Sequence, residues 1–206
     1  SGVEVPISVV PGGTDPNEFP LVQHAPKRPY TFLTLADRNQ RKGWHEVWEA
    51  FYRAFGGKTT GDQDVRLIVK SVPTGNNVTE VIAQGQNLDQ RIVWQIERAP
   101  NMATVYAQAD CVVLPSRSEG WGMPHREAAM MGIPVITQAY SGMDDGHTRE
   151  WAIVVDGGQM QPIPREQAHC LGEWRVVDVQ ELAAAMRACY ERPEQARAHG
   201  LRAAQW

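Results

Sequence analysis

The sequence predicts an α/β protein with a doubly wound parallel sheet and helices on both faces of that sheet. Short apolar runs alternate along the chain with longer stretches in which apolar side chains recur at helical spacing. The chain has 206 residues, of which 42% are hydrophobic and 21% charged, so its length and composition fit one domain with its own core. We therefore expect residues 1–206 to form a single Rossmann-like domain.

Strands and helices alternate in the first half of the chain. The predicted strands are apolar or β-branched runs bounded by turn residues, at 7–10, 30–36, 65–70 and 91–95. The helix over 44–55 is the clearest, because its apolar residues repeat every three or four positions and form one face. A second helix is expected over 77–88, where Gly85 weakens the helical propensity.

The alternation continues to the end of the chain. Asn101 is a predicted N-cap for a helix to Ala109, and Pro124 suits the first turn of a helix over 124–131. Asp178 is a predicted N-cap for a helix that ends near Glu191. The remaining predicted elements are strands over 111–115 and 133–137, a β segment over 151–155 and a helix over 194–204.

Charge and hydropathy argue against two classes of partner. Twenty Lys and Arg against 24 Asp and Glu give a formal net charge of −4, and no basic stripe is present, so we expect no nucleic-acid partner. The longest uncharged stretch, 128–143, is interrupted by Gly132 and Pro134 and is too short to cross a bilayer. We therefore expect no transmembrane segment.

Cysteine and histidine patterns predict neither a disulfide framework nor a metal site. None of the three cysteines lies in a CxxC or Cys/His cluster, so reduced thiols in a cytoplasmic protein are expected for Cys111, Cys170 and Cys189. The six His show no zinc-binding spacing. Asp144 and Asp145 lie in MDDGH, which favours a turn. A metal site is disfavoured because the sequence shows no second cluster of ligand residues to complete the coordination.

The strongest chemical signal is a glycine-containing loop between the strand ending at Pro115 and the helix beginning at Pro124. Gly120 and Gly122 have no Cβ, so their backbone N–H groups can approach a ligand closely. The free N–H groups at the start of the helix attract anions. This combination suits a phosphate or a set of sugar oxygens.

Two carboxylates, Glu119 and Glu127, lie on either side of this loop. A carboxylate repels phosphate but accepts hydrogen bonds from a vicinal diol, so hydroxyl groups are its natural partners. Taken singly, each has an ordinary alternative: Glu119 as a solubilising loop residue, and Glu127 as a favourable charge in a first helical turn.

A second signal is the basic loop after the strand over 30–36. It contains Asp37, Arg38, Arg41 and Lys42. Lys42 and Arg38 are candidates to neutralise a leaving diphosphate at the carboxyl end of the sheet, where such folds bind ligands. The alternative is that these side chains are simply solvated.

These segments resemble the carboxyl-terminal half of retaining GT-B glycosyltransferases of family four, the glycosyl transferases group 1. That family carries EGFG-x-P-x-x-E followed by G-x-P-V-I, and this chain has EGWGMPHRE at 119–127 and GIPVI at 132–136. Three further segments resemble the family's entry linker, its first strand with a Lys-Gly loop, and its A-D-x-x-x-x-P-S segment, at 5–19, 30–51 and 105–116. The resemblance covers about residues 3–140.

The resemblance implies a role for each matching position. Glu119 would hold hydroxyls of the donor sugar, Glu127 the ribose diol and Lys42 the phosphates, and the base would lie near Gln95 and Ile96. The loop that would meet the sugar and diphosphate comprises Gly120, Trp121, Gly122 and Met123. Trp121 stands where the family usually has Phe, and core packing is an equal alternative for it.

Two further features depart from the family pattern. The family's loop arginine precedes the lysine by five positions, whereas Arg38 precedes Lys42 by four, so the match of Arg38 to it is open. The usual glycine pair and following Glu are replaced by residues 141–145, so contacts from that loop to the donor are also open.

The resemblance implies retaining transfer in which the leaving phosphate itself takes the acceptor's proton. No protein nucleophile, divalent metal or cofactor is then required, and the nucleotide-sugar is the substrate. The family also places an acceptor-binding domain before this one. We expect that domain as the partner of this chain, and expect the chain alone to bind donor weakly and to transfer little sugar. Association with a membrane would come through that other domain.

Two alternative functions stay open. One is another GT-B-type enzyme, a phosphorylase or a sugar-nucleotide epimerase, although no lysine is identified that would bind the pyridoxal group of a phosphorylase. The other is a non-catalytic module that binds nucleotide-sugar. The presence of both Glu119 and Glu127 favours a transferase over the module.

Overall fold

The computed structural model describes residues 5, 6, 8, 10–23, 26, 28–36, 40–57, 61–71, 89–164 and 172–206. Within them, one sheet has the strand order β3-β2-β1-β4-β5-β6, and each pair of neighbours in it is parallel. Its strands are β1 (Tyr30–Leu35), β2 (Val65–Lys70), β3 (Ile92–Gln95), β4 (Cys111–Val113), β5 (Val135–Thr137) and β6 (Ile153–Val154). The predicted parallel sheet is confirmed.

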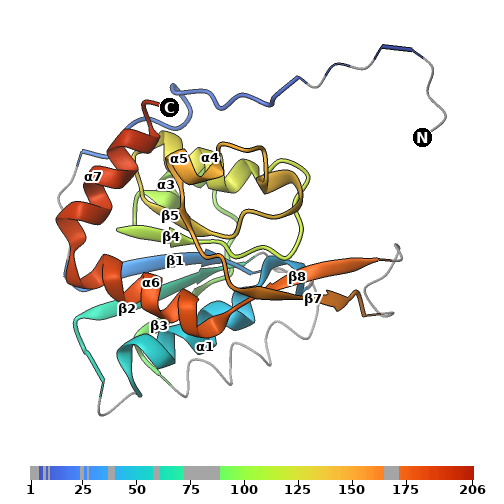
Figure 1. The fold of residues 1–206 in the computed structure, drawn as a ribbon. Helices are drawn as coiled ribbons and strands as arrows, with labels where there is room; N and C mark the ends of the chain where they lie inside the picture. The colour runs from blue at the N-terminus through green and yellow to red at the C-terminus, as the bar shows by residue number, and fades with distance from the viewer. Residues whose placement is uncertain are drawn as a thin grey trace.

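Helices cover both faces of this sheet (Figure 1). The helices are α1 (Trp44–Phe55), α3 (Met102–Tyr106), α4 (Met123–Met130), α5 (Thr148–Trp151), α6 (Val179–Glu191) and α7 (Pro193–Ala203). Helices α1 and α6 pack together over one face, and α3, α4 and α5 cover the other. Helix α7 contacts α4, α5 and α6, so it joins the two layers of helices.

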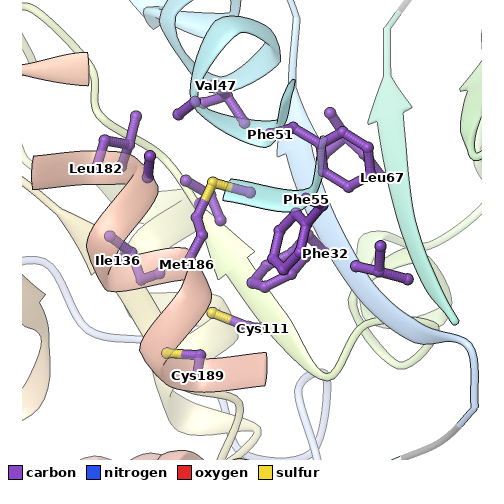
Figure 2. Close-up of a cluster of buried hydrophobic side chains, with 14 of the residues drawn as sticks. Phe32, Val47, Phe51, Phe55, Leu67, Cys111, Ile136, Leu182, Met186 and Cys189 are labelled. Atoms are coloured by element: carbon purple, nitrogen blue, oxygen red, sulfur yellow. The ribbon is translucent and has the colours of Figure 1, made fainter. Parts of the chain in front are cut away.

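The two sides of the sheet have separate cores, because successive side chains of a strand point to opposite faces. In β1, Phe32 packs beneath α1 and α6, whereas its neighbour Leu33 packs beneath the helices of the other face. Figure 2 shows the first of these cores, in which Phe55 of α1 meets Phe32 and Phe51 packs against Phe55. Burial on both faces is what the continuous apolar runs predict.

The order of the strands reverses between β1 and β4. From β1 the chain continues to β2 and β3 on one side, whereas β4, β5 and β6 follow one another on the other side. At such a reversal the chain leaves the two central strands toward opposite sides of the sheet, and folds of this class bind ligands at the carboxyl ends of these strands. The described residues at this point are 36 and 40–43, after β1, and 114–122, after β4.

Several local predictions are confirmed by the hydrogen bonds. The Asn101 side chain accepts from the Ala103 N–H at 2.6 Å, and the Asp178 side chain accepts from the Glu181 N–H at 2.9 Å, so both are N-caps. Helix α1 spans the predicted residues 44–55. The predicted helix over 77–88 lies outside the described residues.

One element prediction is wrong, one is met only in part, and one observed element was not predicted. Residues 8 and 10 lie in no strand, and Val10 is 85% exposed, so the described part of this apolar run does not join the sheet; residues 7 and 9 lie outside the described residues. The predicted β segment over 151–155 is shorter, since Trp151 ends helix α5. An antiparallel hairpin, β7 (Gly158–Pro162) with β8 (Glu173–Val177), was not predicted, because all of β7 is exposed and lacks an apolar alternation.

Candidate functional site

The loops after β1 and β4 are fastened to each other at the point where the strand order reverses. The Arg117 N–H donates to the Arg41 carbonyl at 2.7 Å. Gly43, which precedes α1, has φ 67°, and a Cβ there would lie 2.5 Å from the Pro115 carbonyl oxygen. The left-handed backbone and this close approach together explain the glycine in the Lys42-Gly43 pair.

A carboxylate and two cations from these loops form the centre of the site. Lys42 Nζ lies 2.7 Å from Glu119 Oε1, and Arg41 Nη1 lies 3.1 Å from Glu119 Oε2. Arg41 Nη1 also donates to the Ser118 carbonyl at 2.6 Å. The Glu119 side chain is only 8% exposed, and that of Lys42 is 16% exposed. Two sequence-predicted site residues, 77 positions apart, are therefore brought into direct contact.

The environment of Glu119 keeps it ionised. Burial acts to raise its pKa, but the hydrogen bond from Lys42 and the charge of Lys42 outweigh burial and lower the pKa to about 2. At neutral pH one carboxylate and two cations leave the cluster with one net positive charge. An ionised carboxylate donates no hydrogen bonds and accepts them, so it suits hydroxyl groups, and the surplus positive charge suits phosphate.

We predict that Glu119 makes an acid-sensitive contribution to stability. Its folded-state pKa, about 2, lies below the ordinary value of 4.5, so the contribution is fully present above pH 4.5 and is lost as the pH falls toward 2. The measurement is urea unfolding of wild type and Glu119→Gln from pH 7 to pH 2.5. The stability difference between the two proteins should shrink with acidification, and a difference independent of pH would contradict the ion-pair assignment.

A third loop, the 3-10 turn Ser141–Met143, is docked onto Glu119 and Gly120. The Gly142 N–H and the Ser141 hydroxyl both donate to the Glu119 carbonyl, each at 2.9 Å. A Cβ on Gly142 would overlap the carbonyl group of Gly120. Ser141 has φ 59°, a left-handed backbone that is uncommon for a residue other than glycine. The loop in which the sequence departs from the family that it resembles thus contacts the residues beside Glu119.

The start of α4 completes the arrangement beside Glu119. Gly122 is the N-cap of this helix, with φ 72°, and a Cβ there would overlap the Met143 sulfur. His125 is buried and its Nε2 lies 2.9 Å from the Leu114 carbonyl, so Nε2 carries the proton. Burial lowers the pKa of His125 to about 4, which makes it neutral at pH 7.

Glu127 lies on the side of α4 that contacts α3. Its Oε2 accepts a hydrogen bond from the Tyr106 hydroxyl at 2.8 Å. Burial raises the pKa of Glu127 above its usual value, and the nearby charge of Glu18 acts in the same direction. The two glutamates therefore have different partners: Glu119 is held by cations and Glu127 by a neutral hydroxyl.

Gln95 and Ile96 line a cavity of about 460 Å³ at the carboxyl end of β3. Its wall also includes Lys70, the segment 97–100, Thr104 and Val105 of α3, and Gln108 just after that helix. The Gln95 side chain donates to Gln108 Oε1 at 2.7 Å. Helix α3 therefore contributes both to this cavity and, through Tyr106, to the setting of Glu127.

The remaining predicted site residues are placed differently. The Trp121 ring packs over the Arg126 guanidinium, 3.9 Å from it, and donates through Nε1 to the Gly12 carbonyl. Trp121 thus packs against neighbouring residues at the surface, and its half-buried side chain is not among the buried core residues. Met123 is partly exposed beside it. Arg38 lies outside the described residues.

Asp145 forms an ion pair with Arg126 at 2.5 Å, within a predicted turn that the structure confirms. Among the described residues, no group of three or more His, Cys, Asp or Glu side chains is arranged to hold a metal ion. In the same part of the chain, no helix combines the length and the apolar character needed to span a bilayer.

Sequence reasoning gave no role to Arg41, Ser141, Tyr106 or Lys70. Arg41 was recognisable as part of the basic loop, but its distance from Glu119 depends on how two loops far apart in sequence meet. Tyr106 lies in an apolar helix and gave no polar signal, although a buried Tyr hydroxyl usually needs a partner. The sequence showed that Ser141 stands where the resembled family has glycine, but it did not predict that the Ser141 hydroxyl donates to the Glu119 carbonyl.

A family model described as "Glycosyl transferases group 1" matches residues 17–156. The D-inositol 3-phosphate glycosyltransferase of Pseudarthrobacter chlorophenolicus is 30% identical over 172 residues, which covers 71% of this chain and 40% of the relative. The enzyme of the same name from Corynebacterium kroppenstedtii is 32% identical over 106 residues, covering 47% of this chain and 23% of the relative. The chain thus spans less than half of the length of either relative.

Solved structures share the fold. WaaG, a glycosyltransferase involved in lipopolysaccharide biosynthesis, superposes with a TM-score of 0.63 at 17% identity, covering 87% of this chain and 43% of WaaG. HepE from Anabaena, in complex with UDP-glucose, superposes with a TM-score of 0.62 at 19% identity, covering 85% of this chain and 43% of HepE. At these identities the likeness establishes the architecture and leaves the ligand to be argued from the site.

Proposed function

Because this chain belongs to the glycosyl transferases group 1, we propose that it is the donor-binding part of a retaining glycosyltransferase, which moves a sugar from a nucleotide-sugar to an acceptor. The observation that carries the proposal is the contact of Lys42 and Arg41 with the ionised Glu119 at the point of strand reversal. The site combines a net positive charge for a diphosphate with a carboxylate that accepts hydrogen bonds from sugar hydroxyls.

The electrostatics support a mechanism based on positioning and charge. With a pKa of about 2, Glu119 is a poor proton acceptor at neutral pH, so we assign it the orientation of the donor sugar. Lys42 stabilises the negative charge that develops on the diphosphate as the bond to the sugar breaks. The acceptor attacks from the face that the diphosphate leaves, and the departing phosphate takes the acceptor's proton. No metal and no cofactor takes part in this scheme.

The nucleotide is proposed to extend from the Lys42–Glu119 cluster toward α3. Glu127 accepts one hydrogen bond from Tyr106 and keeps further lone pairs for the ribose hydroxyls. The base is proposed to enter the cavity beside Gln95 and Ile96, whose volume of about 460 Å³ is ample for it. Donor binding then uses the carboxyl ends of β1, β3 and β4.

The rest of the reaction belongs to the whole protein. We propose that an acceptor-binding domain outside this chain closes over the site and supplies the acceptor. It follows that these 206 residues alone should bind nucleotide-sugar weakly and should turn over little or none of it. Robust transfer by the isolated chain would contradict this division of labour.

Glu127→Gln tests the assignment of the ribose. The substitution removes a charge that accepts hydrogen bonds while leaving an amide of the same shape, so nucleoside-diphosphate affinity should fall by about tenfold. The measurement is titration of wild type and variant with UDP-, GDP- and ADP-linked sugars, followed by ligand NMR and thermal shift.

The matched control for this test is Glu49→Gln, on the exposed side of α1, which should change no affinity. Selective binding that Glu127→Gln alone weakens supports a donor site. If the wild-type chain shows no binding to any of these nucleotide-sugars, the proposal is wrong.

A further inference from the structure

Lys70 is a buried lysine that the proposed reaction does not use. It is the last residue of β2, next to Gln95 of β3 in the parallel register, and it is 6% exposed. Its Nζ lies 2.6 Å from the Ser71 carbonyl oxygen and 2.5 Å from the Glu97 carbonyl oxygen, with the Gln95 carbonyl at 3.4 Å. The donors of one ammonium group are thus directed at the backbone that leaves two neighbouring strands.

Burying the Lys70 ammonium in this way costs folding free energy. A buried ammonium loses its hydration, and burial accordingly lowers the pKa of Lys70. Among the residues that the structure describes, no carboxylate forms an ion pair with Nζ; only the more distant charge of Glu97 favours the protonated form. Among the described contacts, the ammonium is held by carbonyl dipoles alone.

The segment that Lys70 holds is a wall of the cavity of about 460 Å³. Lys70 lines this cavity together with Trp94, Gln95, Ile96 and Glu97. The Gln95 carbonyl keeps another partner, the Ser71 N–H at 2.9 Å, but the Glu97 carbonyl has no other donor among the described contacts. Removal of the ammonium would leave the Ser71 and Glu97 carbonyls converging with no donor between them, and the segment 95–97 would move.

We propose that Lys70 is a positioning residue for the nucleotide: its buried ammonium fastens segment 95–97, against which the base of a nucleoside diphosphate binds. The inference rests on the proposed function, because it concerns the same donor site. It adds to the site a residue that acts through the backbone and does not contact the phosphates. Its effect on affinity is confined to ligands that carry a base.

The test compares Lys70→Met with Arg98→Met, using UDP, GDP, ADP and inorganic pyrophosphate as ligands. Arg98 lines the same cavity but is exposed, so its substitution removes the same charge without releasing the segment. For the nucleoside diphosphate that wild type binds best, Lys70→Met should lower affinity at least tenfold, and Arg98→Met no more than about threefold. Pyrophosphate, which has no base, should bind both variants as it binds wild type.

Amide hydrogen exchange in the absence of ligand supplies an independent readout. Segment 95–97 should exchange faster in Lys70→Met, whereas the exchange of β1 and α1 should not change. If Lys70→Met does not fold, Lys70→Gln, which retains a neutral donor, takes its place and should show the same pattern with a smaller loss.

Other results of this comparison would contradict either the positioning role of Lys70 or the proposed function. Equal losses in Lys70→Met and Arg98→Met would mean that only long-range charge matters, and an equal loss of pyrophosphate would mean that Lys70 supports the whole fold; either result overturns the positioning role. Failure of wild type to bind any nucleoside diphosphate, while it binds pyrophosphate, would instead overturn the proposed function.

Discussion

Lys42→Met is expected to weaken binding of a nucleoside diphosphate by at least thirtyfold and to destabilise the fold at the same time. Removal of one partner of a buried, hydrogen-bonded charge pair typically costs about 2–5 kcal/mol, which is roughly thirtyfold or more in affinity. Here the cluster would fall from a net charge of +1 to zero, and Glu119 would keep only Arg41 as a cationic partner. Isothermal titration of the wild-type and variant chains measures the loss.

The double variant Lys42→Met with Glu119→Gln separates the two roles of the lysine. If Lys42 contacts the diphosphate, the double variant should regain thermal stability, because no carboxylate is left poorly neutralised, but it should not regain affinity. Recovery of both properties would mean that Lys42 serves only to neutralise Glu119. In that case the phosphate-binding role would have to move to another cation.

Gly142→Ala is expected to disrupt the site through sterics alone. The new Cβ would overlap backbone atoms of Glu119 and Gly120. Because these are backbone atoms, no change of side-chain rotamer can relieve the overlap. We expect a loss of about 2–4 kcal/mol of unfolding free energy, or displacement of the 141–143 turn with loss of donor binding. Urea unfolding and donor titration measure the two effects.

Two glycines serve as controls for Gly142→Ala. A Cβ at Gly120 meets no atom within 4 Å, so Gly120→Ala should leave stability nearly unchanged even if it obstructs a ligand. Gly13 is equally uncrowded, and Gly13→Ala should change neither stability nor binding. Equal stability of Gly142→Ala and Gly120→Ala would show that the docking of the 141–143 turn does not depend on close backbone contact.

The docked turn gives a physical account of the departure from the family pattern. Ser141 adopts the left-handed conformation that glycine adopts at little cost, and its hydroxyl donates to the Glu119 carbonyl. The hydrogen bond offsets part of the conformational cost at this position. In this chain the Ser141 hydroxyl therefore fastens the 141–143 turn to the loop that bears Glu119.

The hairpin β7–β8 begins at Gly158, just beyond the family match that ends at residue 156. Its second strand is anchored on the site, because the Gln138 side chain donates to the carbonyls of Pro115, Ser116 and Arg175. Trp174 of the same strand stacks on Arg117, which in turn pairs with Glu46 of α1. The hairpin thus braces the loop that carries Glu119, although no pattern in the sequence marked it.

The sequence by itself determined the sheet, most of the helices and the position of the glycine-containing loop. Helical periodicity over 44–55, continuous apolar strands and side-chain caps at Asn101 and Asp178 are local signals, because each depends on residues a few positions apart. Order and alternation then place Lys42 and Glu119 at the carboxyl end of the sheet, since parallel strands carry their loops to one edge.

Only the tertiary structure decided which of these residues meet. The pairing of Lys42 and Arg41 with Glu119, the hydrogen bond of Glu127 to Tyr106, the stacking of Trp121 on Arg126 and the burial of the Lys70 ammonium all join segments that different strands and helices bring together. Such contacts depend on distances set by packing of the whole sheet, and periodicity carries no information about them. The same packing decides charge, because burial and neighbours, rather than residue type, set the ionisation of each glutamate.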